Sequence, residues 1–410
     1  MAHLPYWKAL LPALFAVLSI AGAAHARDLF SASISVGGGP ATILSADRAR
    51  DIPDFIDIQT LLSIDPGYDA TQAVAATLDI RGLRGDLSFD AFANTLRFTV
   101  PAAGVDVSFD GPTRDEALSN FEDWMKGEFG SALAPRDVTT ALLQALVAES
   151  PVDPVAGNPN SLQTRMFDAD FRMGTVGGLS ALRDGGIVPS LFRLDVGGGY
   201  YDADGFDVYA LDLPLHFGFG LGERLALMLD VPMTFTSTEG AWSGMASGGL
   251  GMRVMPFSWW ALTPAARIGG VGSLDVGALA VMYSGTLTSH IRIPLGPIAF
   301  GIGNMGGVAS TIDAVEVEGF AIDYDLTNWI TRNGGYIEGR LAADRLGTGF
   351  GWRVFANDAR FFGDELFLDN YQEVGAAVAA GLPFGGLHLE LAYLTGRSYE
   401  GVNARLGLRF

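Results

Sequence analysis

The sequence predicts an all-β fold: a transmembrane antiparallel β-barrel of about twelve strands, preceded by a small domain of strands and helices. Three observations predict it. Between residues 191 and 410, apolar residues recur at every second position over stretches of about ten residues. No apolar run after residue 26 reaches the roughly 18 residues that a membrane-spanning helix needs. The chain has 54 glycines and no cysteine, which suits many tight turns and excludes disulfide bonds.

The chain begins with the three parts of a secretory signal peptide. Lys8 supplies a positive charge, an apolar run extends to about Ala24, and Ala24-His25-Ala26 is a small-x-small cleavage site. We therefore expect residues 1–26 to be removed after Ala26 during export. The alternative is an N-terminal membrane anchor, for which the apolar run is short.

The charge balance limits the kinds of partner. The formal net charge is −20, and Lys126 is the only lysine after the signal peptide. Nucleic-acid-binding surfaces are basic, so no nucleic acid is expected as a partner. Nothing in the sequence calls for a cofactor.

Residues 27–112 read as a small β-rich domain, because their strand-like stretches are short and split by glycine and proline. Residues 113–160 follow as two helices and a proline-rich linker. The first helix opens with a capping box from Thr113 to Glu116, and the second runs from Pro135 to about Glu149. The first helix carries an apolar stripe: Leu118, Phe121, Trp124 and Met125. This segment either packs within a periplasmic domain or plugs the barrel.

The barrel domain is assigned to residues 161–410, with its strands mainly in 191–410. The expected strands are 191–201, 206–219, 222–235, 245–255, 261–270, 279–293, 297–305, 335–344, 349–358, 373–382, 387–396 and 401–410. Their even number places both ends of the barrel on one side of the membrane. The segment from Ile312 to Tyr324 also alternates, and we place it in a long outer loop.

The two faces of each strand differ in chemistry. In the last strand Val402, Leu406 and Leu408 share one face, while Arg405 and Arg409 share the other. Lipid outside and water inside would produce this pattern. The residues expected to line the lumen are Arg193, Asp195, Asp212, His216, Arg224, Asp230, Arg253, Arg267, His290, Arg292, Glu338, Arg340, Asp344, Arg353, His388, Glu390, Arg405 and Arg409.

The connections are expected to alternate in length. Tight turns are predicted near 220, 256, 294, 346 and 384, and generally longer connections near 240, 274, 306–334 and 359–372. Aromatic residues gather on the side of the tight turns, where an interfacial girdle is expected. They are Phe257, Trp259, Trp260, Phe384 and Phe410.

The exported start, the even set of alternating strands and the closing Leu408-Arg409-Phe410 together resemble the outer-membrane β-barrels of Gram-negative bacteria. The resemblance implies an outer-membrane location, a lipid surround, and Phe410 as a signal read by the barrel-assembly machinery. The layout is also similar to that of autotransporters, in which about twelve strands follow a helix that occupies the lumen.

No constellation for catalysis is found, so no enzyme activity is expected. His216, His290 and His388 share the polar face and are interpreted as lumen lining; they lie on separate strands without thiolate support for zinc. Asp202, Asp204 and Asp207 surround a glycine and could bind calcium through oxygen, but we interpret them as a solvated acidic turn.

Barrels of one shape serve many functions. The first hypothesis is a passive pore for small solutes, partly plugged by the helical segment before the barrel. The alternative is an autotransporter-like translocator or a surface-anchored interaction module. A lipid-modifying enzyme is the least favoured reading.

Overall fold

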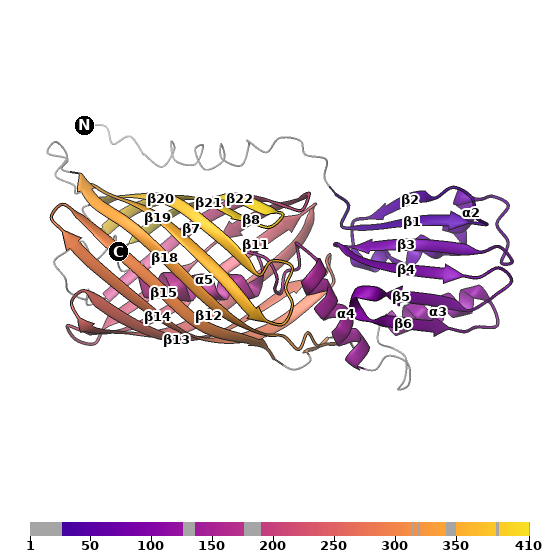
Figure 1. Cartoon of the computed structure of the whole chain (residues 1–410), viewed down its shortest axis with the longest axis horizontal. Helices are drawn as coiled ribbons and strands as arrows, with labels where there is room; N and C mark the ends of the chain where they lie inside the picture. The colour runs from indigo at the N-terminus through magenta and orange to yellow at the C-terminus, as the bar shows by residue number, and fades with distance from the viewer. Residues whose placement is uncertain are drawn as a thin grey trace, which may run out of the picture.

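The computed structural model describes residues 27–125, 136–175, 190–312, 315–317, 320–341, 350–382 and 385–409. Residues 1–26, where a signal peptide is expected, and the predicted site or girdle residues Asp344, Phe384 and Phe410 lie outside these ranges. Two β structures follow one another along the long axis of the molecule, the smaller formed by the N-terminal part of the chain (Figure 1).

The N-terminal domain (residues 27–125) is built on a six-stranded antiparallel sheet with the order β2-β1-β3-β4-β5-β6. The helix α2 (Ile58–Ile64) precedes β3, and α3 (Arg114–Met125) follows β6. Three short 3-10 turns, η1 (Ala49–Asp51), η2 (Pro53–Ile56) and η3 (Pro101–Ala103), complete it. The strands are β1 (Phe30–Val36), β2 (Thr42–Ala46), β3 (Val74–Ile80), β4 (Leu83–Phe89), β5 (Leu96–Val100) and β6 (Val105–Phe109).

One face of this sheet packs against α3. The rings of Phe98, Phe109, Phe121 and Trp124 lie with neighbouring centroids 5.3–6.2 Å apart, in mostly tilted or edge-on arrangements. The expected cap is present, because the Glu116 backbone N–H donates to Thr113 Oγ1 at 3.2 Å. Leu118, Phe121 and Trp124 of the predicted apolar stripe are therefore part of the core of this domain.

The second sheet closes into a barrel, and the prediction of twelve strands is confirmed within the described residues. The closing pair is β22 with β7. Two strands are interrupted at prolines, β8/β9 at Pro214 and β10/β11 at Pro232, where a ladder hydrogen bond is missing. The strand segments are β7 (Ser190–Ala203), β8 (Phe206–Asp212), β9 (Leu215–Gly220), β10 (Leu225–Val231), β11 (Met233–Thr238), β12 (Ala241–Phe257), β13 (Trp260–Ser273), β14 (Ala278–Leu295), β15 (Ile298–Thr311), β18 (Thr327–Leu341), β19 (Phe350–Gly363), β20 (Asn370–Leu382), β21 (Gly385–Gly396) and β22 (Tyr399–Arg409).

The expected outer loop at 306–334 is shorter than predicted. The strand β15 continues to Thr311 and β18 already begins at Thr327, so the connection spans residues 312–326. It contains a small hairpin of β16 (Val315–Val317) and β17 (Phe320–Ile322). The start of β18 was missed because polar Thr331 and Asn333 face outward there while Ile330 is buried.

The alternation of the barrel strands has the expected sense. Large apolar side chains are exposed on the outer surface, as illustrated by Leu250, Leu287 and Trp329, which are 53%, 52% and 58% exposed. At one end Phe257, Trp259 and Trp260 stack with centroids 5.4–6.4 Å apart, as the girdle prediction requires. Trp242 and Trp329 are exposed at the other end. Two aromatic belts border the apolar surface, which is the arrangement of a membrane-spanning barrel.

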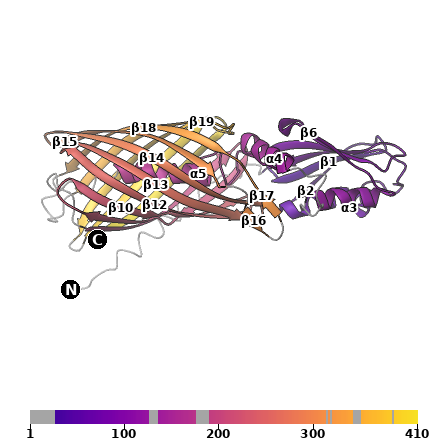
Figure 2. The ribbon, with the colours of Figure 1, turned by 90° about the horizontal axis from the view of Figure 1, so that it is seen from below.

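The N-terminal domain lies against one end of the barrel, which we call the domain end (Figure 2). The connections 204–205, 239–240, 274–277, 312–326, 364–369 and 397–398 are at this end, while residues 190 and 409 are at the opposite, far end. The predicted difference in turn length is weaker than expected, because the connections 239–240 and 397–398 at the domain end have only two residues each. No described helix combines the length and apolar character needed to cross a membrane.

Candidate functional site: the plugged lumen

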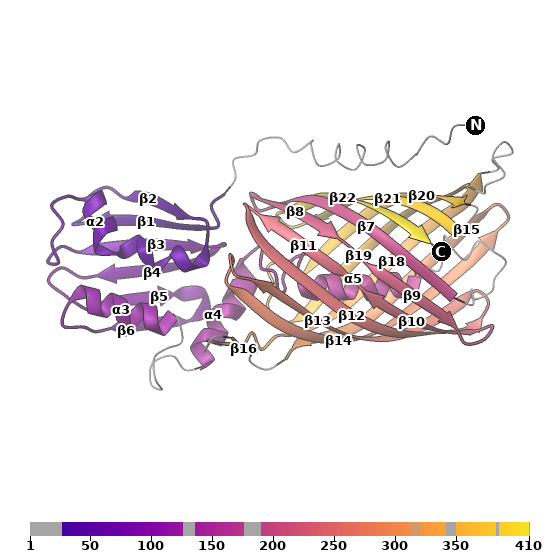
Figure 3. The ribbon, with the colours of Figure 1, turned by 180° about the vertical axis from the view of Figure 1, so that it is seen from behind.

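A helix that the sequence did not predict occupies the lumen. The helix α5 (Leu162–Thr175) runs inside the barrel along its axis (Figure 3). The expected plug at 113–160 is correct only in its last part: α3 packs on the N-terminal sheet and α4 (Arg136–Glu149) lies at the domain end, while the linker from residue 150 onward is inside. Residues 150–175 fill the barrel.

One side of α5 fits a row of small residues on the wall. Among its neighbours are Gly269, Gly303 and Gly307 on β13 and β15. A Cβ atom at Gly303 would lie 2.6 Å from Thr175 Cγ2, and one at Gly269 would lie 3.0 Å from Leu162 Cδ1. Larger residues would push the helix away, so this wall is shaped to receive α5.

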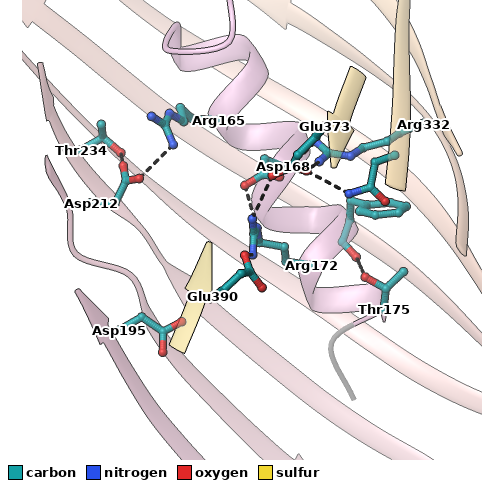
Figure 4. A network of polar contacts seen from close by, with 12 residues as sticks. Arg165, Asp168, Arg172, Thr175, Asp195, Asp212, Thr234, Arg332, Glu373 and Glu390 are labelled. Atoms are coloured by element: carbon teal, nitrogen blue, oxygen red, sulfur yellow. Dashed lines mark hydrogen bonds and ion pairs between the residues drawn. The ribbon is translucent and has the colours of Figure 1, made fainter. Parts of the chain in front are cut away.

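The opposite side of α5 is held by ion pairs to strands on the other half of the wall (Figure 4). Arg165 Nη1 lies 3.0 Å from Asp212 Oδ2, and Asp168 Oδ1 lies 3.0 Å from Arg332 Nη1. Arg172 bonds Glu390 at 2.7 Å and Asp168 at 2.9 Å. These side chains are largely buried, and charges that leave water are stable in such a place only when they are paired.

Asp170 makes a further ion pair on the glycine-lined side. Its Oδ1 lies 2.9 Å from Arg267, and its Oδ2 accepts a hydrogen bond from Thr286 at 3.0 Å. Arg267 also pairs with Asp230 at 2.8 Å. All three charged groups are almost fully buried, so the helix is tied to β10, β13 and β14 at one point.

The segment before α5, residues 150–161, closes the domain end of the lumen, and we call it the sealing loop. Every residue from 150 to 161 is buried, although this segment is neither helix nor strand. Its backbone polar groups are satisfied locally, since Asp153 Oδ1 accepts from the Val155 N–H at 2.8 Å and Asn158 Oδ1 from the Asn160 N–H at 2.9 Å. The Asn160 side chain donates to Tyr399 Oη at 2.6 Å. A loop with these contacts seals the mouth.

The lumen is not polar along its whole length, because its part near the domain end is lined by apolar side chains. Phe167 packs on Phe361 with centroids 6.2 Å apart, and Tyr201 on Tyr399 with centroids 5.9 Å apart. Inward-facing Met282 belongs to the same buried cluster. The plug and the wall thus share a hydrophobic core at this end, which the expectation of a wet lumen did not include.

The N-terminal domain is attached to the barrel through several turns of the domain end. Arg27 pairs with Asp204 at 3.1 Å, and the Ala49 N–H donates to the Asp275 carbonyl at 3.0 Å. The helix α4 is attached to the same end, since the Phe367 N–H donates to the Val147 carbonyl at 3.0 Å. Arg81, at the β3–β4 turn, is almost fully buried and lies 3.4 Å from Asp153 in the sealing loop.

Most of the residues predicted to line the lumen do so. Asp195, Asp212, Asp230, Arg267, His290, Glu338, Arg353 and Arg405 are buried inside, with Arg193, His216, Arg253, Arg292, His388, Glu390 and Arg409 on the same faces but more accessible. Arg340 is exposed at the far rim. The prediction for Arg224 is wrong: it precedes the start of β10, is exposed, and bonds the Pro256 carbonyl at 3.3 Å. The alternation had been extended beyond the end of the strand.

The three histidines point into the lumen as predicted. His216 Nδ1 lies 3.0 Å from Asp230, and His388 Nε2 lies 3.7 Å from Asp195. His290 Nε2 is 2.8 Å from Tyr336 Oη. Within the described residues, no group of three or more His, Asp or Glu side chains is arranged to hold a metal ion.

The acidic turn at 202–207 is engaged in protein contacts. Asp202 accepts from the Gly205 N–H at 3.1 Å, Asp204 pairs with Arg27, and Asp207 accepts from Tyr200 Oη at 2.8 Å. The three carboxylates do not converge on one point, so the calcium alternative has no geometric basis in these residues.

Sequence reasoning missed α5 and two of its wall partners, Arg332 and Glu373. Arg332 lay in the expected outer loop, and Glu373 stood at the first position of an expected strand. One signal was available: Arg165, Asp168 and Arg172 recur at helical spacing, so they share one face of a helix. A charged stripe is normally a solvated face, and only the surrounding barrel turns it inward.

Small cavities remain on the charged side of α5. One of about 50 Å³ borders Arg172, Arg332 and Tyr336, and another of about 30 Å³ borders Arg165, Asp212 and His216. Both are lined in part by charged side chains and are large enough for water molecules.

No family model matches the chain, and no curated protein does. Solved structures similar to its barrel are outer-membrane β-barrels. The β domain of the Bordetella autotransporter BrkA is 14% identical, with a TM-score of 0.43, and the match covers 54% of this chain and 99% of that one. The translocator domain of the autotransporter NalP from Neisseria meningitidis is 12% identical, with a TM-score of 0.42, and the match covers 60% of this chain and 96% of that one. The NanC porin is 14% identical, with a TM-score of 0.34, and the match covers 53% of this chain and 98% of that one. These scores are low, so the functional argument rests on the chain's own geometry.

Proposed function

We propose that this protein is an outer-membrane anchor of the autotransporter-like kind, which holds its N-terminal domain at the cell surface on a permanently plugged barrel. One observation carries the proposal: the N-terminal domain and the barrel's own chain ends lie at opposite ends of the barrel, with α5 running between them. The passive-pore hypothesis becomes the second candidate.

The orientation follows from the usual architecture of outer-membrane barrels. An even number of strands returns the chain to the side on which it started, and in these barrels the longer loops are extracellular while the short turns are periplasmic. Residues 190 and 409 are at the far end, so the far end is assigned to the periplasm. The domain end, with its longer connections at 312–326 and 364–369, is then outside.

The contacts of α5 with the wall support a fixed plug rather than a movable gate. Wall glycines accommodate one side of the helix, and ion pairs from Arg165, Asp168, Asp170 and Arg172 hold it from several strands. The buried loop at 150–161 closes the domain end. One observation favours the pore candidate: two small cavities lined in part by charged side chains lie beside α5.

Sidedness can be tested with two matched epitope insertions. Gly38, in the β1–β2 turn, and Gly296, in the β14–β15 turn, are both open positions at opposite ends of the molecule. Antibody should label the Gly38 insertion on intact cells and the Gly296 insertion only after the outer membrane is permeabilised. The reverse labelling would place the N-terminal domain in the periplasm and overturn the proposal.

The plug can be tested in planar bilayers. The mature chain should show no steady conductance, and a deletion of residues 27–175 should open a conducting barrel. A matched deletion of residues 27–125, which keeps α4, the sealing loop and α5, should remain closed. Steady current through the mature chain would favour the passive pore.

A further inference from the structure

The N-terminal sheet has one uncovered edge. Among the residues that the structure describes, the strand β2 pairs only with β1 and ends the sheet on that side. The other edge, β6, lies in the part of the sheet that α3 packs on and carries an Asp106–Arg97 ion pair at 2.6 Å. A free edge presents unpaired backbone N–H and C=O groups that another strand can use.

β2 lacks the features that usually protect an edge. Between Thr42 and Ala46 there is no charged residue and no proline, and the conformation is regular in pairing with β1. Ile43 lies opposite Ser33 on the open polar face of the sheet, with 74% of its surface exposed. Leu44, on the other face, is only partly buried. An added strand would cover both side chains.

The charge around β2 indicates what kind of strand fits. Residues 47–69 follow β2 directly and include α2; they hold six acidic and two basic residues. Asp47 and Asp54 in this segment are exposed. The whole N-terminal domain, residues 27–125, has sixteen acidic and seven basic residues, a net charge of −9. A second copy of the domain would be repelled, and a cationic chain would be attracted.

We propose that β2 is a docking edge for an extended, cationic peptide segment of a partner protein, which adds to the sheet as a seventh strand. Backbone hydrogen bonds to β2 give the contact, apolar side chains of the segment cover Ile43 and Leu44, and its basic side chains meet the acidic residues of 47–69. β2 runs roughly along the barrel axis, so the bound segment would stand along the membrane normal (Figure 1).

This inference adds a partner class to the proposed anchoring function, but its binding test does not depend on sidedness. Purified full-length protein in detergent would be titrated against a fluorescent peptide of alternating lysine and valine, with fluorescence anisotropy as the readout. Two comparison peptides would be used: one alternating glutamate and valine, and a lysine–valine peptide with every second backbone nitrogen methylated. We expect both to bind at least about tenfold more weakly, because one loses charge attraction and the other loses edge hydrogen bonds.

Variants of the protein locate the contact. The double substitution Asp47→Asn, Asp54→Asn should weaken the lysine–valine peptide severalfold. The matched control Asp115→Asn, Asp123→Asn removes the same charge from α3, beside β5 and β6, and should leave binding unchanged.

Three outcomes would overturn the proposal. If the methylated peptide binds as well as the unmethylated one, the attraction is charge alone and the edge is unused. If none of the peptides binds, β2 is not a docking edge for this class of segment. If light scattering finds a dimer that the lysine–valine peptide does not dissociate, the edge belongs to a second copy of the chain. A negative result in the epitope test for sidedness would not change the interpretation of any of these three outcomes.

Discussion

The two sheets of this protein use the same alternation in opposite senses. In the N-terminal sheet apolar residues such as Leu78 and Phe98 face a core of side chains, while Thr77 and Arg97 face water. In the barrel, Leu250 and Leu287 face outward and Asp230 and Arg267 face inward. A period of two therefore fixes the face of each residue but not the solvent on either side. Strand length and closure of the sheet decide that.

The largest expected effect separates the two kinds of apolar environment. Phe121→Ala removes a ring that is 1% exposed between α3 and the N-terminal sheet, and should cost about 3–5 kcal/mol in the free energy of unfolding of that domain. Phe362→Ala removes a ring that is 55% exposed on the lipid face and leaves no cavity, so its cost should be clearly smaller. Thermal unfolding followed by near-ultraviolet circular dichroism would compare them. Equal losses would contradict the core assignment.

The second prediction places the same charge on the outer face of each sheet. Leu250→Arg puts a cation on the lipid face near the middle of β12 and should destabilise the barrel by about 2–4 kcal/mol. Thr99→Arg on the water-facing side of β5 should change stability by less than about 0.5 kcal/mol. Urea titration of both variants in lipid vesicles measures the difference. If Leu250→Arg were neutral, the outer face would not contact lipid.

The third prediction compares the two faces of a single barrel strand. Gly303 on β15 faces α5, and Gly306 faces outward with open space around it. Gly303→Val should destabilise the seated helix by about 1–3 kcal/mol through overpacking, and Gly306→Val should not. Hydrogen exchange of the backbone amides of 162–175 reports the seating. Equal protection in the two variants would show that the wall glycines are not needed for the plug.

The smallest effect is a dependence on pH with opposite sign in two places. Burial raises the pKa of Asp153 in the sealing loop above 3.8, so its docked state is favoured at low pH and loses stability as pH rises through the raised value. On the open face of the sheet, the hydrogen bond from Arg97 lowers the pKa of Asp106, whose contribution is present above 3.8 and lost as pH falls. Hydrogen exchange at 150–161 and at 105–109 between pH 3 and 8 would measure how the local stability of each segment changes with pH. Asp153→Asn should remove the pH dependence at 150–161 and leave that at 105–109 unchanged.

The strands could be predicted because their pattern is local. The parity that placed His290 and Arg405 inside depends only on neighbours along one strand, and it held wherever the strand itself continued. It failed for Arg224, which lies beyond a strand end, and the start of β18 was missed because polar Thr331 and Asn333 face outward there. The plug itself could not be predicted, because α5 is polar on the face that meets Asp212 and Glu390. Its burial exists only once distant strands surround it.

The filled lumen also constrains the order in which the molecule is assembled. On the proposed orientation, the N-terminal domain is outside while the barrel's first strand starts on the periplasmic side, and α5 leaves no passage for a folded six-stranded sheet. The domain must therefore cross as an extended chain, or while the seam between β22 and β7 is still open. On that orientation, folding of the domain outside the cell would make the crossing irreversible, and the last residues to pass, those of α5, would remain in the channel that they used.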